Sequence, residues 1–228
     1  MSRIVAILGA ESTGKTTLAR GLAEALAQRT GQRCTWVPEH LRAWCDAQGR
    51  TPRLDEQAGI ARAQAAAIEA AAVENDWVVA DTTPLMTAVY SQHVFGDGHL
   101  FAEALAWQRR CLHTLVTGLD LPWVADGLQR DGPQVRVPVD DLLRGHLMRA
   151  GLPWSVVLGA GPNRAGNALG ALGLRAPGQD PHGPAAEAPE DALARWAATG
   201  PRLRCRDCDD PACERQSHRD PPAAGPSP

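Results

Sequence analysis

The hydrophobic residues of this chain gather in short runs, and longer segments with helical spacing separate them. The runs are RIVAIL (3–8), CTWVPE (34–39), WVVA (77–80), residues 112–119 and WSVVLG (154–159), and each predicts a buried strand. Helical spacing, clearest for Leu18, Leu22 and Leu26, predicts helices at 16–28, 54–75, 84–94, 101–111, 139–150 and 163–172. Apolar strands that alternate with helices are typical of a parallel sheet covered on both faces.

This pattern ends near residue 174. The segments RAPGQDPHGPAAEAPE and DPPAAGPSP are rich in Pro, Gly and Ala and lack the large apolar residues that build a core. We therefore predict a folded domain at residues 1–173 and a disordered C-terminal tail at residues 174–228.

Composition and charge narrow the class of protein. The 228 residues are 44% hydrophobic and 21% charged, which is typical of a soluble globular protein. The net charge of −3 provides no basic field, and no apolar run approaches the roughly 18 residues that span a bilayer, so neither nucleic acid nor membrane is expected as a partner. MSRIVAILGA leads into a glycine-rich loop without the features of a signal peptide, so a cytoplasmic location is expected. In that compartment the six cysteines do not indicate a disulfide framework.

The stretch GAESTGKTT carries the strongest chemical signal. It matches G-x-x-x-x-G-K-[ST] between a strand and a helix, where glycines let the backbone N–H groups surround a phosphate. Lys15 is the only lysine of the chain. A lysine is expected at this position because a compact ammonium on a flexible stem fits between phosphate oxygens, whereas a planar guanidinium does not. The sequence thus predicts a P-loop NTPase three-layer α/β sandwich with a mainly parallel five-stranded sheet. ATP is expected on Gly9, Glu11, Ser12, Thr13, Gly14, Lys15, Thr16 and Thr17.

Two carboxylates follow predicted strands on the same side of the sheet as this loop. Asp81 ends WVVAD, where an aspartate can hold Mg²⁺ together with Thr16 or bind an acceptor hydroxyl; it can also cap the helix that starts at Pro84. Glu39 ends the second strand, where it can face an acceptor, or it can be an ordinary acidic residue in the first turn of a helix.

The segment LPWVADGLQRDGPQVR (121–136) is broken by Pro, Gly and Asp. It carries Arg130 and Arg136, so it can act as a mobile lid that brings guanidinium groups onto a transferring phosphate. The alternative is a plain surface loop with two solvated arginines.

Five stretches in order resemble the ribosylnicotinamide kinase domain of the NadR family of P-loop kinases. They are GAESTGKTTL, PEHLRAW, ADTTPLMTAVY, PWVADGLQRDGPQVR and GAGPNRAGNAL, and the resemblance covers about residues 3–172. The resemblance places Glu39 and Arg42 on the family's acid and arginine, matches Asp126, Gly127 and Arg130 to its lid, and points to Arg164 as an arginine near the nucleotide base. Thr83 stands where the family often has a second aspartate, and His40, Ala43 and Trp44 also depart from its pattern. The resemblance implies kinase activity without the adenylyltransferase domain of larger members.

Two functions remain open from the residues. The first is an ATP- and Mg²⁺-dependent kinase that phosphorylates a nucleoside hydroxyl, with nicotinamide riboside implied by the resemblance. Lys15, Asp81, Glu39 and Arg130 are its expected catalytic residues, with Tyr90 near the acceptor and Trp44 stacking on the base. The second is a nucleotide-dependent ATPase or switch without a small acceptor.

The predicted tail contains a separate cluster, RCRDCDDPACERQSH. Cys205, Cys208, Cys213 and His218 supply four nitrogen and sulfur ligands that can close a tetrahedral zinc site. The alternative is a disordered tail with incidental thiols.

Overall fold

The structure is a computed structural model, and it describes residues 2–124 and 132–174. Within these ranges the strands form one sheet in the order β2-β3-β1-β4-β5, and every neighbouring pair is parallel. The strands are β1 (Arg3–Leu8), β2 (Cys34–Val37), β3 (Trp77–Asp81), β4 (His113–Thr117) and β5 (Trp154–Val157). Because β1 lies between β3 and β4, the loop after β1 lies where the strand order reverses, which is where open parallel sheets bind ligands.

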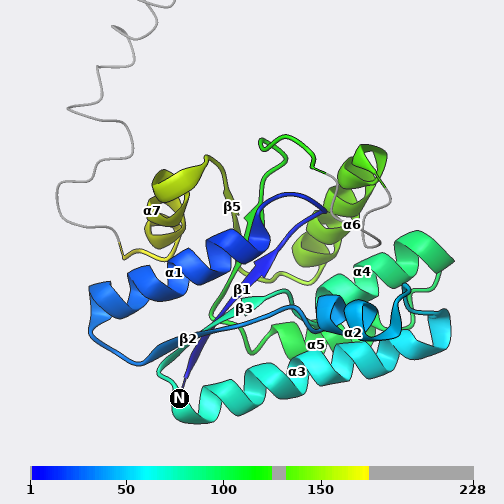
Figure 1. The fold of residues 1–228 in the computed structure, drawn as a ribbon, viewed down its shortest axis with the longest axis horizontal. Coiled ribbons are helices and arrows are strands. Elements are labelled where there is room, and N and C mark those ends of the chain that lie inside the picture. Colours follow the sequence, from blue (N-terminus) through cyan, green and yellow to red (C-terminus); the bar gives the residue numbers. More distant parts are fainter. Residues whose placement is uncertain (1, 125–131, 175–228) are drawn as a thin grey trace, which may run out of the picture. The chain divides into compact units, whose positions relative to one another are not determined.

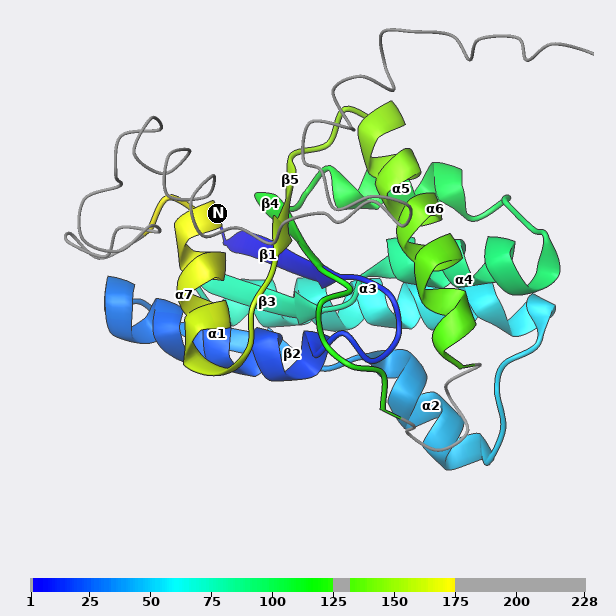
Figure 2. The same cartoon turned by 90° about the horizontal axis from the view of Figure 1, so that it is seen from above.

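Helices cover both faces of the sheet (Figures 1 and 2). One face carries α1 (Lys15–Thr30) and α7 (Gly161–Ala171), and the other carries α3 (Gln57–Glu74), α4 (Pro84–Phe95), α5 (Phe101–Gln108) and α6 (Arg136–Arg149). The helix α2 (His40–Gln48) packs against α3, and the short 3₁₀ turns η1 (Leu54–Glu56) and η3 (Pro133–Val135) precede α3 and α6. The predicted three-layer sandwich is confirmed.

The central strand β1 shows how the two layers are built. Ile4, Ala6 and Leu8 belong to the core beneath α3–α6, whereas Val5 and Ile7 belong to the core beneath α1 and α7. Successive side chains of a strand point to opposite faces, so a strand buried on both faces is apolar at every position. This is why RIVAIL has no polar alternation.

Two of the observed elements depart from the predicted ones at prolines. The strand β2 ends at Val37, two residues early, because Pro38 has no N–H for the sheet ladder. Glu39 therefore stands at the N-cap position of α2 rather than in the strand. The helix α6 begins at Arg136 rather than at Val139, since the first turn of a helix tolerates a proline such as Pro138.

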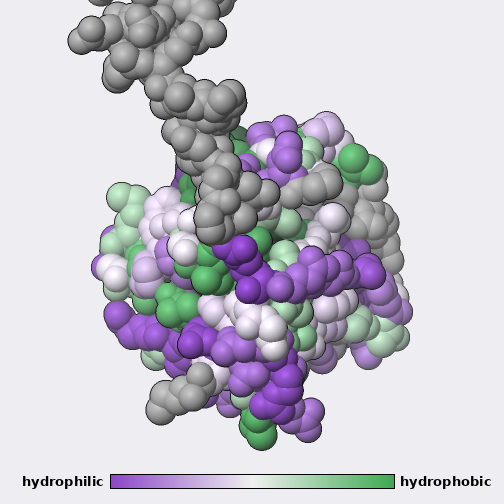
Figure 3. All heavy atoms as spheres, turned by 90° about the vertical axis from the view of Figure 1, so that its left-hand side faces the viewer, coloured by the Kyte–Doolittle hydropathy of each residue, from purple (hydrophilic) through white to green (hydrophobic). Residues whose placement is uncertain are grey.

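The end of the molecule seen in Figure 3 lies away from the loop that precedes α1, and it mixes hydrophilic and hydrophobic residues as ordinary protein surfaces do. None of the described helices is long and apolar enough to cross a membrane. Residues 175–228 lie outside the described residues, so the predicted tail and the domain boundary stay predictions.

Gly21 tests the assignment of α1. A Cβ at this helical position meets no atom within 4 Å, so Gly21→Ala is expected to raise the free energy of unfolding by about 0.5–1 kcal/mol through helix propensity. Urea unfolding at 25 °C measures this, with Gly9→Ala as the contrasting variant, which is expected to destabilise. A loss of stability in Gly21→Ala contradicts the packing of α1.

Candidate active site

Hydroxyl contacts hold the loop after β1 against β4. Thr117 Oγ1 lies 3.1 Å from Leu8 O and 2.6 Å from Thr13 Oγ1, and Thr13 Oγ1 lies 2.8 Å from Ala10 O. Both threonines are fully buried, so water does not compete for these contacts. A Cβ at Gly9 would lie 2.1 Å from Thr117 Oγ1, so this close approach of loop and strand requires the glycine.

The rest of the loop has the conformation of an anion site. Ser12 (φ 53°) and Gly14 (φ 73°) are left-handed, and backbone of this kind turns successive N–H groups toward a common centre. Gly14 is also the N-cap residue of α1, whose start carries positive potential. Lys15 Nζ donates to Ala10 O at 3.0 Å, so the ammonium lies over the loop.

Asp81 ends β3 beside this loop and is 1% exposed. The Thr16 hydroxyl donates to its carboxylate, while Oδ1 has no hydrogen-bond partner within the described part of the chain. Burial raises the pKa of the Asp81 carboxyl above its ordinary value, and the Thr16 hydrogen bond and the charges of Lys15 and Arg42 oppose this only in part. A buried carboxylate oxygen without a partner, beside a hydroxyl, fits the oxygen ligands that Mg²⁺ requires.

The helix that follows β3 is capped by another residue. Thr83 Oγ1 accepts from Leu85 N at 3.3 Å and donates to Gln108 Oε1 at 2.6 Å. This observation removes the alternative in which Asp81 caps the helix. It also shows that Thr83, which replaces the family's second aspartate, is fully buried and turned toward Gln108.

Glu39 lies at the start of α2 and is half-buried. Its side chain makes no capping hydrogen bond with the helix, and it lines the same cavity as the phosphate loop. The second alternative for Glu39, a residue at a helix start, is thus correct in position, but the side chain is directed to the cavity.

Gln64 of α3 joins the turn after β2 to the turn after β3. Its Oε1 accepts from His40 N at 2.6 Å, and its Nε2 donates to Pro38 O at 3.3 Å and to Thr82 O at 3.5 Å. Thr82, which directly follows Asp81, has a left-handed φ of 71° that is costly for a residue other than glycine. Since Gln64 is 2% exposed, its three bonds tie the two strand ends in a buried setting.

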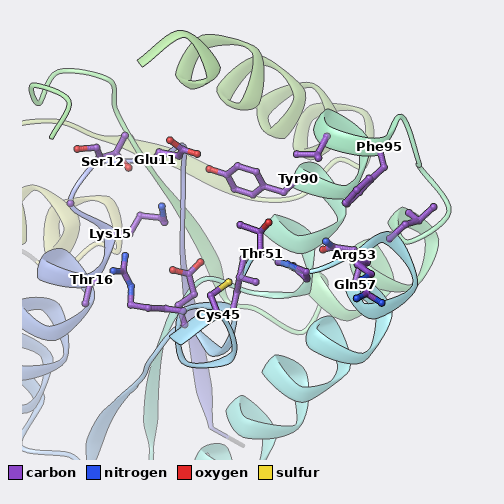
Figure 4. A pocket seen from close by; sticks show the side chains of 18 of the residues that line it. Glu11, Ser12, Lys15, Thr16, Cys45, Thr51, Arg53, Gln57, Tyr90 and Phe95 are labelled. Atoms are coloured by element: carbon purple, nitrogen blue, oxygen red, sulfur yellow. The ribbon is translucent and has the colours of Figure 1, made fainter. Parts of the chain in front are cut away.

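A single cavity of about 670 Å³ connects these groups (Figure 4). At one end lies the phosphate loop, with Lys15 and Thr16. At the other end, Phe95 of α4 lies near Arg53 of the connection before α3 and Gln57 at the start of α3, and Tyr90 and Thr51 lie between the two ends. Between the two ends lie Glu39, the N-cap residue of α2, and Leu41, Arg42 and Cys45 of α2 itself.

The prediction that Trp44 stacks on the base of the acceptor is wrong. Trp44 does not line the cavity; its ring stacks against the Arg50 guanidinium, 5.0 Å from the ring centroid. On α2 the residues at 41, 42 and 45 face the cavity, and position 44 falls on another side of the helix. Tyr90, expected near the acceptor, does line the cavity, together with Phe95.

Arg53, Gln57 and Phe95 were missed by the sequence analysis. Arg53 belongs to the connection before α3, Gln57 is the first residue of α3, and Phe95 ends α4; no motif marks any of them. The apolar Phe95 beside the helix-ending Gly96 is the only signal, and it equally fits a surface residue.

The remaining predicted residues fall in three places. Arg164 is 4% exposed, donates to Gly159 O at 3.0 Å and lies 3.9 Å from Asp120, so it supports the turn after β5 beside the phosphate loop. Arg136 is the first residue of α6 and is buried, so it is not an exposed lid arginine as expected.

The other predicted residues lie outside the described residues. They are the lid residues Asp126, Gly127 and Arg130 and the proposed zinc ligands Cys205, Cys208, Cys213 and His218. Within residues 2–124 and 132–174, no group of His, Cys, Asp or Glu side chains is placed to hold a metal by itself.

A family model described as an AAA domain matches residues 4–164, which is most of the chain. The chain belongs to this family. A search of curated proteins finds no match.

Two solved structures with a similar fold are NadR proteins. The crystal structure of NadR in complex with NAD and AMP-PNP is 20% identical, with a TM-score of 0.56 over 75% of this chain and 48% of that chain. NadR in complex with NR is 21% identical, with a TM-score of 0.57 over 75% of this chain and 50% of that chain. The chain thus spans about half the length of these NadR chains. The likeness confirms that the chain has the fold that the resemblance to NadR implied.

Burial of the Asp81 carboxylate is expected to lower the free energy of unfolding of the ligand-free protein. Burial holds the pKa of Asp81 in the folded protein above its ordinary value of 3.8. Between these two pKa values the folded state binds more protons than the unfolded state. The free energy of unfolding therefore falls as the pH rises from the ordinary pKa through the folded-state pKa. Asp81→Asn is therefore expected to raise the melting temperature of the ligand-free protein at pH 7, with the gain shrinking toward pH 4. Thermal unfolding at several pH values measures this.

The exposed Asp141→Asn is the matched control and is expected to leave the melting temperature nearly unchanged. A lower melting temperature of Asp81→Asn at pH 7 contradicts the dominance of burial at this carboxylate.

Proposed function

We propose that this protein is an ATP-dependent kinase that transfers the γ-phosphate to a hydroxyl of a nucleoside-like small molecule. The observation that carries the proposal is the continuous cavity, which extends from the phosphate loop past Glu39 to Tyr90 and Phe95. An ATPase needs room for the triphosphate and a water. A kinase needs, in addition, a lined space of molecular size beyond the γ-phosphate.

The nucleotide end supports triphosphate binding. The loop supplies N–H donors and Lys15, and Thr16 and Asp81 would hold Mg²⁺. Bound Mg²⁺ neutralises the charge that develops on the phosphates. The charges of Lys15 and Arg42 both act on Asp81, so two cations stand close to the position of the transferring group. Arg164, behind Gly14, supports this end, and Arg130 is proposed as a lid arginine.

The acceptor end supports a role for Glu39 as the group that orients or deprotonates the acceptor hydroxyl. Glu39 lines the cavity between the phosphate loop and the aromatic residues, so an acceptor in the distal space has this carboxylate beside the end that faces the phosphate. Transfer requires Glu39 and the Thr16–Asp81 pair to keep a constant separation. We propose that Gln64 keeps it, since it binds the backbone next to both carboxylates.

Nicotinamide riboside is the first acceptor to test. A fold of this kind occurs in NadR, whose solved structure contains NR, and the stretches GAESTGKTTL and PEHLRAW resemble the NadR kinase domain. The proposed acceptor class is a riboside with a planar ring, in keeping with the aromatic side chains at the distal end.

Acceptor-dependent turnover tests the proposal. ADP release from Mg·ATP is expected to rise when nicotinamide riboside or another riboside is added, with phosphorylated riboside formed in equal amount. Lys15→Arg keeps the charge but cannot fit between the phosphates, so it is expected to lower turnover about a hundredfold or more, whereas Arg20→Lys on the exposed side of α1 is a neutral control. ADP release that is insensitive to every riboside supports the ATPase or switch instead.

The role of Gln64 has its own test. Gln64→Met keeps the side-chain size but removes three hydrogen bonds, and Gln108→Met removes the buried bonds to Thr83 and Thr114. Each variant is expected to lose roughly 1–3 kcal/mol of stability. Only Gln64→Met is expected to lower kcat, about tenfold to a hundredfold, and to release ADP without phosphorylating the acceptor. Equal kcat values for the two variants would show that Gln64 is only structural.

A further inference from the structure

The distal end of the cavity exposes large apolar side chains. Leu54, Val94 and Phe95 are 44%, 53% and 40% exposed, and all three line the cavity beside the Tyr90 ring. Apolar side chains gathered in a concave site, rather than scattered over the surface, indicate a binding surface. The ligand part that reaches this end therefore has apolar or aromatic faces.

One charged side chain stands among these apolar groups. The other charged residues of the cavity are Glu11 and Lys15 in the phosphate loop and Glu39 and Arg42 at the start of α2. Among the described lining residues of the distal end, the charge belongs to Arg53, and Figure 4 shows it beside Gln57 and Phe95.

The segment that carries Arg53 is pinned by a neighbouring ion pair. Arg50 donates from Nη1 and Nη2 to the two Glu56 carboxylate oxygens at 2.8 and 2.7 Å, and Arg53 N donates to the same carboxylate at 2.7 Å. The Arg50 fork lowers the pKa of the Glu56 carboxyl to about 2, with the Arg53 N–H adding to the effect, so this anchor persists at all physiological pH values.

The anchor leaves the Arg53 guanidinium available. Glu56 is already engaged in both of its oxygens by Arg50, and the Arg53 guanidinium forms no ion pair with a described residue. A guanidinium at the edge of an apolar pocket is suited to a carboxylate, which it binds through two parallel hydrogen bonds.

We infer that the acceptor carries an anionic group on its ring and that Arg53 binds it. This inference rests on the proposed kinase function and specifies its substrate class. The ring lies against Phe95, Leu54 and Val94, its carboxylate meets Arg53, and its sugar hydroxyl points back toward Glu39 and the phosphate loop. A ring with a neutral carboxamide makes the same apolar contacts but leaves the guanidinium without its charged partner.

Two ribosides that differ only in this group provide the test. Nicotinic acid riboside carries a carboxylate where nicotinamide riboside carries a carboxamide. The wild-type protein is expected to show a kcat/KM about tenfold or more higher for the carboxylate compound. Arg53→Gln is expected to remove this preference by raising KM for the carboxylate riboside alone, and Arg53→Lys is expected to keep part of it.

Arg62→Gln is the matched control, because Arg62 is exposed on α3 and does not line the cavity. It is expected to keep the wild-type preference. Equal or reversed preference in the wild type, or a preference that survives in Arg53→Gln, overturns the inference while the kinase function stands. A lack of riboside-dependent ADP release with both compounds overturns the kinase function and, with it, the inference.

Discussion

The contact between Thr117 and the loop after β1 is the constraint on which the site depends. A glycine at position 9 lets the Thr117 hydroxyl approach the backbone, and the same hydroxyl then meets Leu8 O and Thr13 Oγ1. The loop is therefore shaped by β4, a strand more than a hundred residues away in the chain. Since the start of α1 follows directly, this contact also sets where Lys15 and Thr16 emerge. A phosphate site of backbone N–H groups needs such fixed geometry, because a loose loop would lose its order at each release of ligand.

The acidic side of the site is built at a cost in stability. Asp81 is buried with a raised pKa and with Oδ1 unpaired among the described residues, and Thr82 next to it is left-handed. Both features disfavour the ligand-free fold. Gln64 holds Thr82 in place through the bond from its Nε2 to Thr82 O. Such local strain is common where a protein keeps a carboxylate ready for a cation.

The end of the cavity proposed for the acceptor has a different physical character. It is open, partly apolar and assembled from α2, the connection to α3, and α4. The ion pair of Arg50 and Glu56 fixes the segment that carries Arg53. This division suits the proposed kinase function. In that proposal the phosphate chemistry is the same for every acceptor and is held by the rigid sheet, whereas the acceptor is recognised by connecting segments, which can change without disturbing the core.

The sequence by itself determined the sheet, its two helical layers and the phosphate loop. These follow from local order: unbroken apolar runs, helical spacing and a motif whose residues are neighbours in the chain. Asp81 and Glu39 could also be located, because the end of a parallel strand places them on the loop's side of the sheet. Only the tertiary structure decided that Thr83 caps α4, that Trp44 lies against Arg50 outside the cavity, and that Gln64 joins two strand ends. It also decided that Arg53 and Phe95 share one cavity with Lys15. Contacts of this kind join residues far apart in the chain, and they depend on side-chain direction and helix rotation, which no local pattern records.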